Sequence, residues 1–138
     1  MANALYDDYK ESCLGGGAHS FTDIPVDTIK VALVDLTVDY TFSAAHQDKA
    51  DVTSYTGSTD QTLGAKTVTA GVFDNTADIT FTSLSQSASK TVGAIVHFKD
   101  SGSAATSPLS SYHDNFTAVV PNGGDIVIQY NASGIYAL

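Results

Sequence analysis

The sequence predicts an all-β fold, an antiparallel β-sandwich or barrel-like domain with one short N-terminal α-helix. From about residue 28 onward, apolar residues recur at every second position in several short runs, which is the period of a β-strand. Dense turn sequences separate these runs, as they do in sandwiches and barrels. The chain has 138 residues, enough for one domain that builds a core without disulfide or metal staples.

Residues 3–14 form the one segment with helical spacing. Leu5, Tyr9 and Cys13 lie four residues apart, and this predicts an apolar stripe on one helix face, with Cys13 as a small buried residue. Asn3 is the expected N-cap, and a run of three glycines is expected to end the helix. A three-turn helix is marginal alone in water, so it is predicted to pack either on its own domain or on a partner.

The segment at 29–34 is apolar on both faces, which indicates a central strand. Later segments alternate apolar residues with threonine or other polar residues, and this predicts half-buried strands. Those strands are expected at 67–72, 79–82, 91–98, 126–130 and, at the end of the chain, 135–138.

Turns and loops are predicted from glycine, proline and short polar residues. They are expected at Asp74-Asn75, 100–102, 121–124 and 131–134, and as Ser/Thr-rich loops at 53–62, 83–91 and 101–107. The predicted organisation is a single domain, in which residues 1–27 form an N-terminal arm and short helix and residues 28–138 form the sandwich.

The charge balance excludes two classes of partner. The chain has six lysines, no arginine and fifteen acidic residues, for a net charge of -9. Binding to phosphate backbones or anionic membrane surfaces requires clustered lysine and arginine, so neither nucleic acid nor membrane is an expected partner. No apolar run approaches the roughly 20 residues of a membrane span, and no secretory signal is visible, which favours a chain that starts in the cytoplasm.

Residues that could support catalysis are scattered. The sequence has no G-x-S-x-G turn, and its four histidines, His19, His46, His97 and His113, stand far apart. His97 is expected to point outward from its strand, and His113 with Asp114 is interpreted as a polar loop rather than a triad fragment. The single cysteine can form no intramolecular disulfide. The prediction is that the chain is not an enzyme.

Metal and sugar sites are weakly indicated. The acidic run at 74–78 offers oxygen ligands, but it lacks the residue order of an EF-hand loop. Neither a metal nor a cofactor is expected. Carbohydrate-binding modules commonly present exposed tryptophan; this chain has none, and its tyrosines are predicted to be buried rings with solvated hydroxyls.

Several segments, in order along the chain, resemble small virion proteins of tailed bacteriophages. These segments are 1–6, 29–35, 77–81, 93–102 and 121–126. Within that class, the chain is most similar to head decoration proteins, also called cement proteins.

The resemblance implies a structural virion protein on the outer capsid surface, assembled in the bacterial cytoplasm, that binds the phage major capsid protein and stabilises its lattice. It also implies a homo-oligomer, with a trimer favoured. Leu5, Tyr6, Tyr9 and Cys13 are the candidate partner-interface residues. The alternative is a tail, neck or fibre-associated structural protein, or a receptor- or carbohydrate-binding module.

Overall fold

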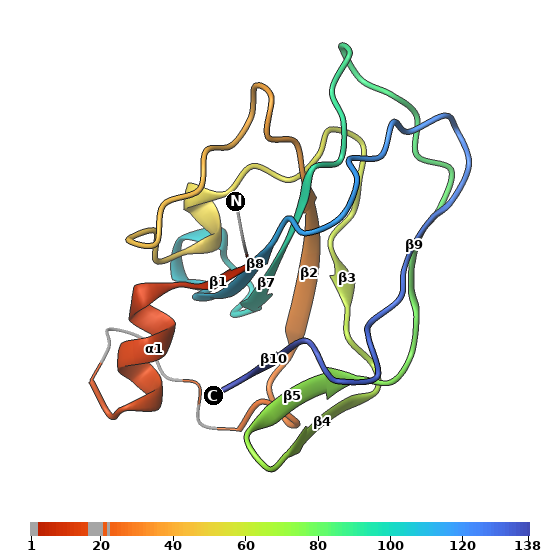
Figure 1. The fold of residues 1–138 in the computed structure, drawn as a ribbon. Coiled ribbons are helices and arrows are strands. Elements are labelled where there is room, and N and C mark those ends of the chain that lie inside the picture. The colour runs from red at the N-terminus through yellow and green to blue at the C-terminus, as the bar shows by residue number, and fades with distance from the viewer. Residues whose placement is uncertain (1–2, 17–20, 22) are drawn as a thin grey trace.

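The computed structural model describes residues 3–16, 21 and 23–138. Its architecture consists of antiparallel sheets and one short helix, which confirms the predicted fold class (Figure 1). The described strands form open sheets, and none of these sheets closes into a barrel. In this part of the chain, no helix has the length and apolar character needed to span a membrane.

Ten strands and one α-helix make up the regular structure of the described residues. In chain order they are β1 (Ala4–Leu5), α1 (Asp7–Cys13), β2 (Ile29–Val34), β3 (Gln61–Thr62), β4 (Lys66–Thr69), β5 (Val72–Asn75), β6 (Ile79–Phe81), β7 (Ala94–Lys99), β8 (Leu109–His113), β9 (Ile126–Ile128) and β10 (Tyr136–Ala137). Two short 3₁₀ turns, Lys49–Asp51 and Ala104–Thr106, lie in the loops.

The main sheet has five strands in the order β1-β8-β7-β2-β3. β2 therefore lies between two neighbours, which confirms the prediction of a central strand. Its alternation divides the core in two, because successive side chains of a strand point to opposite faces. Ile29, Val31 and Leu33 enter one apolar cluster, and Ala32 and Val34 enter the other.

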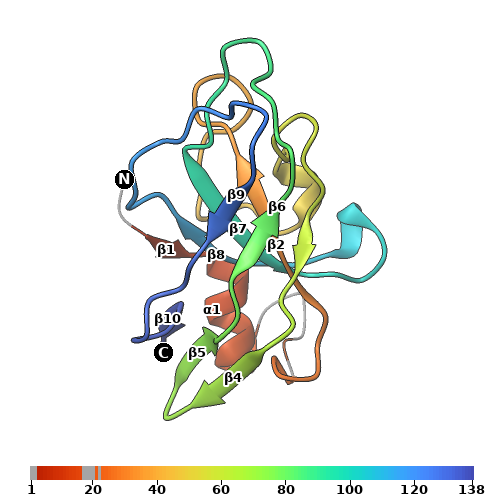
Figure 2. The same ribbon diagram turned by 90° about the vertical axis from the view of Figure 1, so that its right-hand side faces the viewer.

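The two faces of the main sheet are covered by different parts of the chain. We call one the tyrosine face: Tyr112 and its neighbours pack there under residues 36–52, including Tyr40 and Val52. We call the other the cavity face: it lies under two small sheets, β10-β5-β4 and β6-β9. Figure 2 shows β6 and β9 in front of β2 and β7.

The alternating segment at 67–72 is two strands rather than the single strand predicted. β4 and β5 pair antiparallel from Thr69 and Val72 outward, so Ala70 and Gly71 form a two-residue hairpin turn. Both have positive φ, 51° and 79°, as a type I′ turn requires. The turn predicted at Asp74-Asn75 is also wrong, because both residues belong to β5.

β7 and β8 differ from the sequence expectation because both of their faces are covered. β7 is buried along its whole length apart from Lys99, although a half-buried strand was predicted. β8 is entirely buried, although His113 was assigned to a polar loop. A β-bulge places Ser110 opposite no partner residue, and its hydroxyl donates to the carbonyl of His97 at 3.0 Å. Serine can therefore occupy this buried strand because its hydroxyl has a partner.

The described part of the N-terminal segment joins the main sheet. β1 pairs with β8, so the helix begins at Asp7 and not at residue 3. Asn3 is not its N-cap; its side-chain oxygen accepts from the backbone N–H of Asp114 at 3.3 Å. The helix packs on its own domain, one of the two options that the sequence left open. Cys13 is exposed, so its predicted burial is wrong.

Candidate functional site

A buried polar network lies on the cavity face, where β7 and β8 pair. His97 and Ser111 are directly opposite in the register, and His113 lies two residues further along β8, on the same face. His97 Nδ1 is 3.1 Å from Ser111 Oγ, and His113 Nε2 is 3.1 Å from the same oxygen. The second ring nitrogen of His97, Nε2, lies 2.8 Å from the hydroxyl of Tyr130, just beyond β9.

Both histidines of this network are held neutral. Complete burial lowers the pKa of His97 well below its usual value, and the neighbouring His113 lowers it further. Burial lowers the pKa of His113 to about 4, although the charge of Asp114 acts in the opposite direction. A neutral imidazole has one donor and one acceptor nitrogen. The Ser111 hydroxyl, which can donate once and accept, is therefore suited to bridge the two rings.

The network contains a serine between two histidines, but the arrangement is not that of a serine hydrolase. Ser111 is 0% exposed, so a substrate has no access to its oxygen. The far nitrogen of His97 contacts a tyrosine hydroxyl, whereas a catalytic triad places a carboxylate there. The expectation that His97 points to solvent is wrong, since it too is 0% exposed. These contacts hold the sheet together.

A cavity of about 440 Å³ opens beside the network, a volume in the range of ligand-binding pockets. Its lining includes β9, the segment that follows β9, and residues of the segment 115–119. Leu33, Val92 and Ile95 of the core also line the cavity, and His113 and Tyr130 are among its polar lining residues. Asn3, Asn115, Thr117, Gln129 and Asn131 line it as well, so the hollow has a mixed apolar and polar lining.

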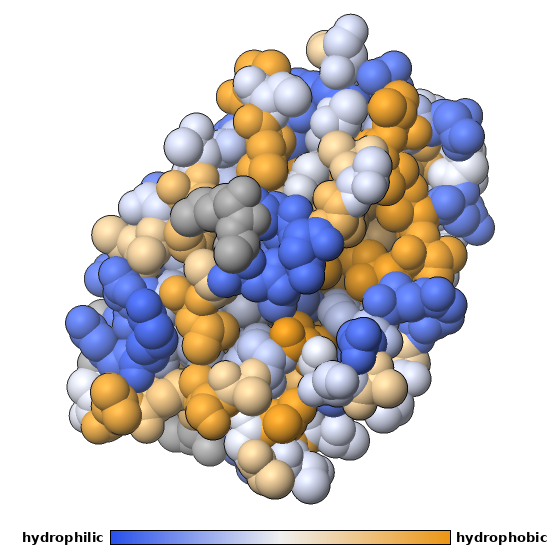
Figure 3. All heavy atoms as spheres, viewed as in Figure 1, coloured by the Kyte–Doolittle hydropathy of each residue, from blue (hydrophilic) through white to orange (hydrophobic). Residues whose placement is uncertain are grey.

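Large apolar side chains surround this cavity and are exposed to solvent. They are Phe116 (38% exposed), Val119 (38%), Val120 (55%) and Val127 (50%). We call these four residues the apolar rim; all but Val120 line the cavity. Figure 3 shows apolar residues gathered on the part of the surface near β9, beside hydrophilic ones. Apolar patches bordered by polar residues are typical of protein interaction sites.

Acidic groups lie next to the cavity. The exposed carboxylate of Asp78 accepts a hydrogen bond from Gln129, a lining residue, at 3.2 Å. Asp125 directly precedes β9 and is also exposed. The charge of Asp74, together with the larger effect of burial, raises the pKa of Tyr130. Asp78 and Asp125 therefore place exposed acidic side chains next to the cavity.

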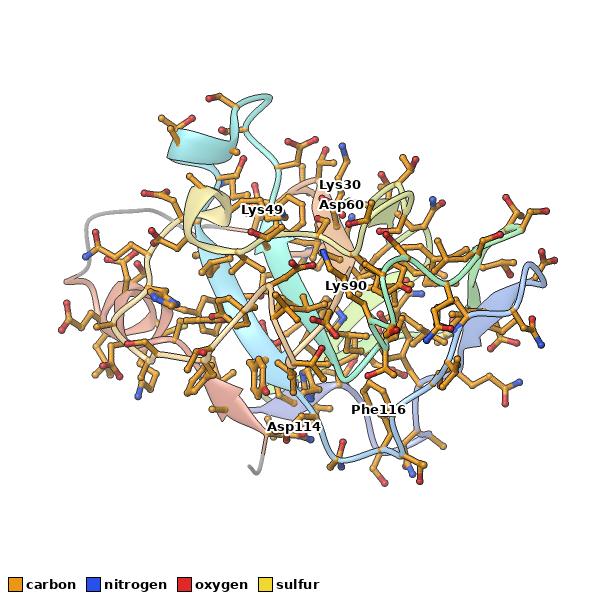
Figure 4. All side chains as sticks on the ribbon, turned by 90° about the horizontal axis from the view of Figure 1, so that it is seen from above. Lys30, Lys49, Asp60, Lys90, Asp114 and Phe116 are labelled. Atoms are coloured by element: carbon orange, nitrogen blue, oxygen red, sulfur yellow. The ribbon has the colours of Figure 1, made fainter. Side chains whose placement is uncertain are left out.

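The lysines are engaged elsewhere. Five of the six form ion pairs among the described residues: Lys10–Asp7, Lys30–Asp100, Lys49–Asp60, Lys90–Asp39 and Lys99–Asp27. None of the six lysines lines the cavity. In Figure 4, Lys30 and Lys49 lie toward the edge of the view opposite Phe116 and Asp114. The acids used in these ion pairs are not those beside the cavity.

Another buried acid, Asp35, organises a loop. Burial opposes its charge, but hydrogen bonds from the Thr37 hydroxyl and from the backbone N–H groups of Thr91, Val38 and Asp39 lower the pKa of the Asp35 carboxyl to about 2. This carboxylate connects the end of β2 to the segment before β7. Its shifted pKa has a structural cause, and it does not face the cavity.

The predicted interface residues are largely occupied by the domain itself. Tyr6 is buried, with its hydroxyl 2.9 Å from that of Tyr40. Tyr9 is buried and accepts a hydrogen bond from the Tyr136 hydroxyl at 2.9 Å. Leu5 is half-buried and Cys13 is exposed. The structure therefore does not join the four into one free surface, and the main exposed apolar group near the cavity is the apolar rim.

The other candidate ligands do not assemble into a metal site. His46 lies beside the Tyr40 hydroxyl, 2.9 Å from its Nδ1, and His19 lies outside the described residues. Asn75, from the acidic run at 74–78, is buried and holds the backbone, accepting from Ala65 N–H and donating to Ala77 O. Within the part of the chain that the structure describes, no three metal-binding side chains cluster.

Comparisons with protein-family models, with curated proteins and with solved structures returned no match.

Proposed function

We propose that this chain is a structural protein of a phage virion, a capsid decoration protein that binds the outside of the head and stabilises the lattice of the major capsid protein. The proposal starts from the sequence resemblance. The observation on the molecule that best supports it is the apolar rim, which gives the domain an exposed surface suited to protein contact.

The proposed mechanism is adhesion without chemistry. A rim of four apolar side chains offers each copy a modest interface, and binding many copies to one lattice adds up to a large total stabilisation. The negative charge and the absence of arginine agree with a position away from packaged DNA. As the resemblance implies, the copies are expected to associate as trimers, which analytical ultracentrifugation of the purified chain would measure.

The test of placement is the number of copies per virion. Quantitative mass spectrometry of purified particles is expected to find this chain in amounts comparable to the major capsid protein, and a cryo-EM map is expected to place it on the outer surface. A few copies per particle would instead indicate the neck, tail or fibre, and complete absence from particles would refute a virion role.

The test of the surface uses capsids that lack this protein. Val120→Asp in the apolar rim is expected to weaken rebinding to these capsids about tenfold or more, since it places a charge in an apolar contact. Val68→Asp is the matched control, because Val68 is also an exposed valine, at 45%, but lies on β4 and does not line the cavity. Equal rebinding by the two variants would exclude the apolar rim as the capsid contact.

A further inference from the structure

β9 has an open edge beside the cavity. Among the described strands it pairs only with β6, so the backbone groups on its other side face no strand. The residues of β9 line the cavity, and so do residues of the segment 115–119. An unpaired strand edge is a template for pairing with another chain. Here the edge borders a hollow into which side chains of an added strand could project.

The lining of the hollow determines which side chains a segment paired with β9 could carry. Side chains in an added strand alternate between the two faces of the sheet, so every second one would face inward. The inward positions would meet the more accessible apolar lining residues, such as Phe116 and Val119. Of the polar lining residues, His113 and Tyr130 belong to the closed hydrogen-bond network. The others are neutral amides and one threonine: Asn3, Asn115, Thr117, Gln129 and Asn131. Apolar side chains can therefore be accommodated here, with neutral polar groups beside them.

The charge around the hollow adds a second requirement. Asp78 and Asp125 are exposed beside β9, and none of the lysines lines the cavity. An acidic segment would be repelled at this site, whereas lysine or arginine next to the apolar stretch would be attracted. The charge pattern therefore favours a partner segment with basic residues.

We propose that an extended segment of a partner protein binds along the open edge of β9, adds a strand to the β6-β9 sheet, and inserts alternate apolar side chains into the cavity while its lysine or arginine residues approach Asp78 and Asp125. This mode of binding is β-strand addition, in which backbone hydrogen bonds provide affinity and side-chain pockets provide specificity. The inference rests on the proposed function and defines the capsid segment that the apolar rim would hold.

A library of short random peptides, selected against the full chain, tests the proposal. The enriched peptides are expected to alternate apolar residues and to carry lysine or arginine. Binding of a labelled enriched peptide is expected to shift the NMR signals of β9 and of residues 115–119. Enrichment of acidic or uncharged peptides, shifts confined to other elements, or no enrichment at all would overturn the proposal.

Matched variants sharpen this test. Val127→Lys places a positive charge on β9, and it is expected to weaken binding of the enriched peptides at least about tenfold. Val68→Lys, on the exposed strand β4, is expected to leave binding unchanged. Val127 is half exposed, so the variant is expected to fold, which thermal unfolding would verify. Equal binding by both variants, or a Val127-dependent homodimer formed through this groove, would contradict the proposal.

The proposal and the proposed function can fail separately. If virions carry the chain in high copy number but the peptide selection fails, the capsid contact uses another mode and only the strand-addition proposal is lost. If basic, alternating peptides bind but virions lack the chain, the groove is a peptide site in a protein with a different role.

Discussion

The two faces of the main sheet carry similar apolar side chains but differ in how they are covered. On the tyrosine face, residues 36–52 lie over the sheet, and the rings of Tyr6, Tyr40 and Tyr112 pack together with one hydroxyl contact at 2.9 Å. On the cavity face, two separate small sheets leave a hollow of about 440 Å³, whose lining includes β9 and residues of the segment 115–119. The first arrangement closes the core, and the second leaves part of it accessible.

This difference shows that the covering segments, and not the composition of the strands, decide which face of the sheet keeps an accessible hollow. β2 supplies apolar residues to both. The covering segments decide whether those residues contact only their own domain. Binding sites commonly occur where a rigid scaffold is incompletely covered, because the exposed apolar atoms gain most from a partner.

Leucine truncation provides the largest expected effect. Leu109 on the tyrosine face and Leu33 beside the cavity are both 0% exposed. Leu109→Ala is expected to lower the free energy of unfolding by about 4–5 kcal/mol and Leu33→Ala by about 3 kcal/mol. Leu33 lies next to the hollow, so the space that it vacates would join the hollow instead of remaining an enclosed cavity. Urea unfolding of both variants measures the difference. A larger loss for Leu33→Ala would contradict the contrast between the faces.

Lowering the pH is expected to destabilise the protein through His113, on the cavity face. In an unfolded chain a histidine has a pKa near 6.5, whereas burial lowers the pKa of native His113 to about 4. Between these pH values only the unfolded state takes up the proton, so the free energy of unfolding falls as the pH drops from about 6.5 to about 4.

His113→Gln measures this contribution. The variant keeps a hydrogen-bonding amide near the position of Nε2 but cannot titrate. The slope of its free energy of unfolding against pH is expected to be smaller than that of the unmodified protein, by up to about 1.4 kcal/mol per pH unit. Urea unfolding at several pH values between 4 and 7 gives both slopes. Identical slopes for the two proteins would show that native His113 is as easily protonated as the unfolded residue.

The next largest loss of stability is expected at Gly134, where the backbone lies close to β5. Gly134 has φ +95°, and a Cβ there would lie 2.3 Å from Val72 Cγ1 and 2.9 Å from the carbonyl oxygen of Phe73. Gly134→Ala is expected to destabilise the fold by about 2–3 kcal/mol.

Gly102→Ala is the control that distinguishes the steric cost of the Gly134 substitution from the cost of the backbone conformation. Gly102 has φ +91°, but a Cβ there would meet nothing within 4 Å. This variant is expected to lose only the conformational cost, about 1 kcal/mol. Thermal unfolding of both variants tests the comparison, and equal losses would show that the contacts of Gly134 relax without cost.

The smallest expected effect is a gain at the β4-β5 hairpin, which helps cover the cavity face. Ala70 occupies the first turn position with φ 51°, where asparagine is better suited. Ala70→Asn is expected to raise the free energy of unfolding by about 0.5 kcal/mol. Ala77→Asn, at an exposed position without positive φ, is expected to give no gain. A loss of stability in Ala70→Asn would argue against the type I′ turn.

The strands that sequence periodicity predicted correctly are those with a strong apolar pattern. β2, β6 and β10 lie where alternation placed them. The alternation of apolar residues, on one face of a strand or on both, is present in the sequence regardless of which segments cover the strand. β8 was not predicted, since Ser110 and Ser111 make its sequence polar. Its burial depends on hydrogen-bond partners from β7, which a local pattern does not contain.

The candidate site was beyond prediction for a related reason. The apolar rim combines Phe116, Val119 and Val120 from an irregular segment with Val127 from β9. A run of apolar residues at 116–120 was the available signal, but nothing local indicates that this run stays exposed. Tyr6 and Tyr9, predicted as interface residues near the helix, are instead buried. Their hydroxyls contact those of Tyr40 and Tyr136, which lie far from them in the sequence.

The sequence alone determined the class of the fold, the central strand and the acidic, arginine-free surface, because periodicity and charge are local properties that burial does not alter. The meeting of His97, Ser111, His113 and Tyr130, the open edge of β9 and the cavity beside it arise from three-dimensional packing. They depend on strand order, register and the path of covering loops, which are set by contacts between residues far apart in the chain.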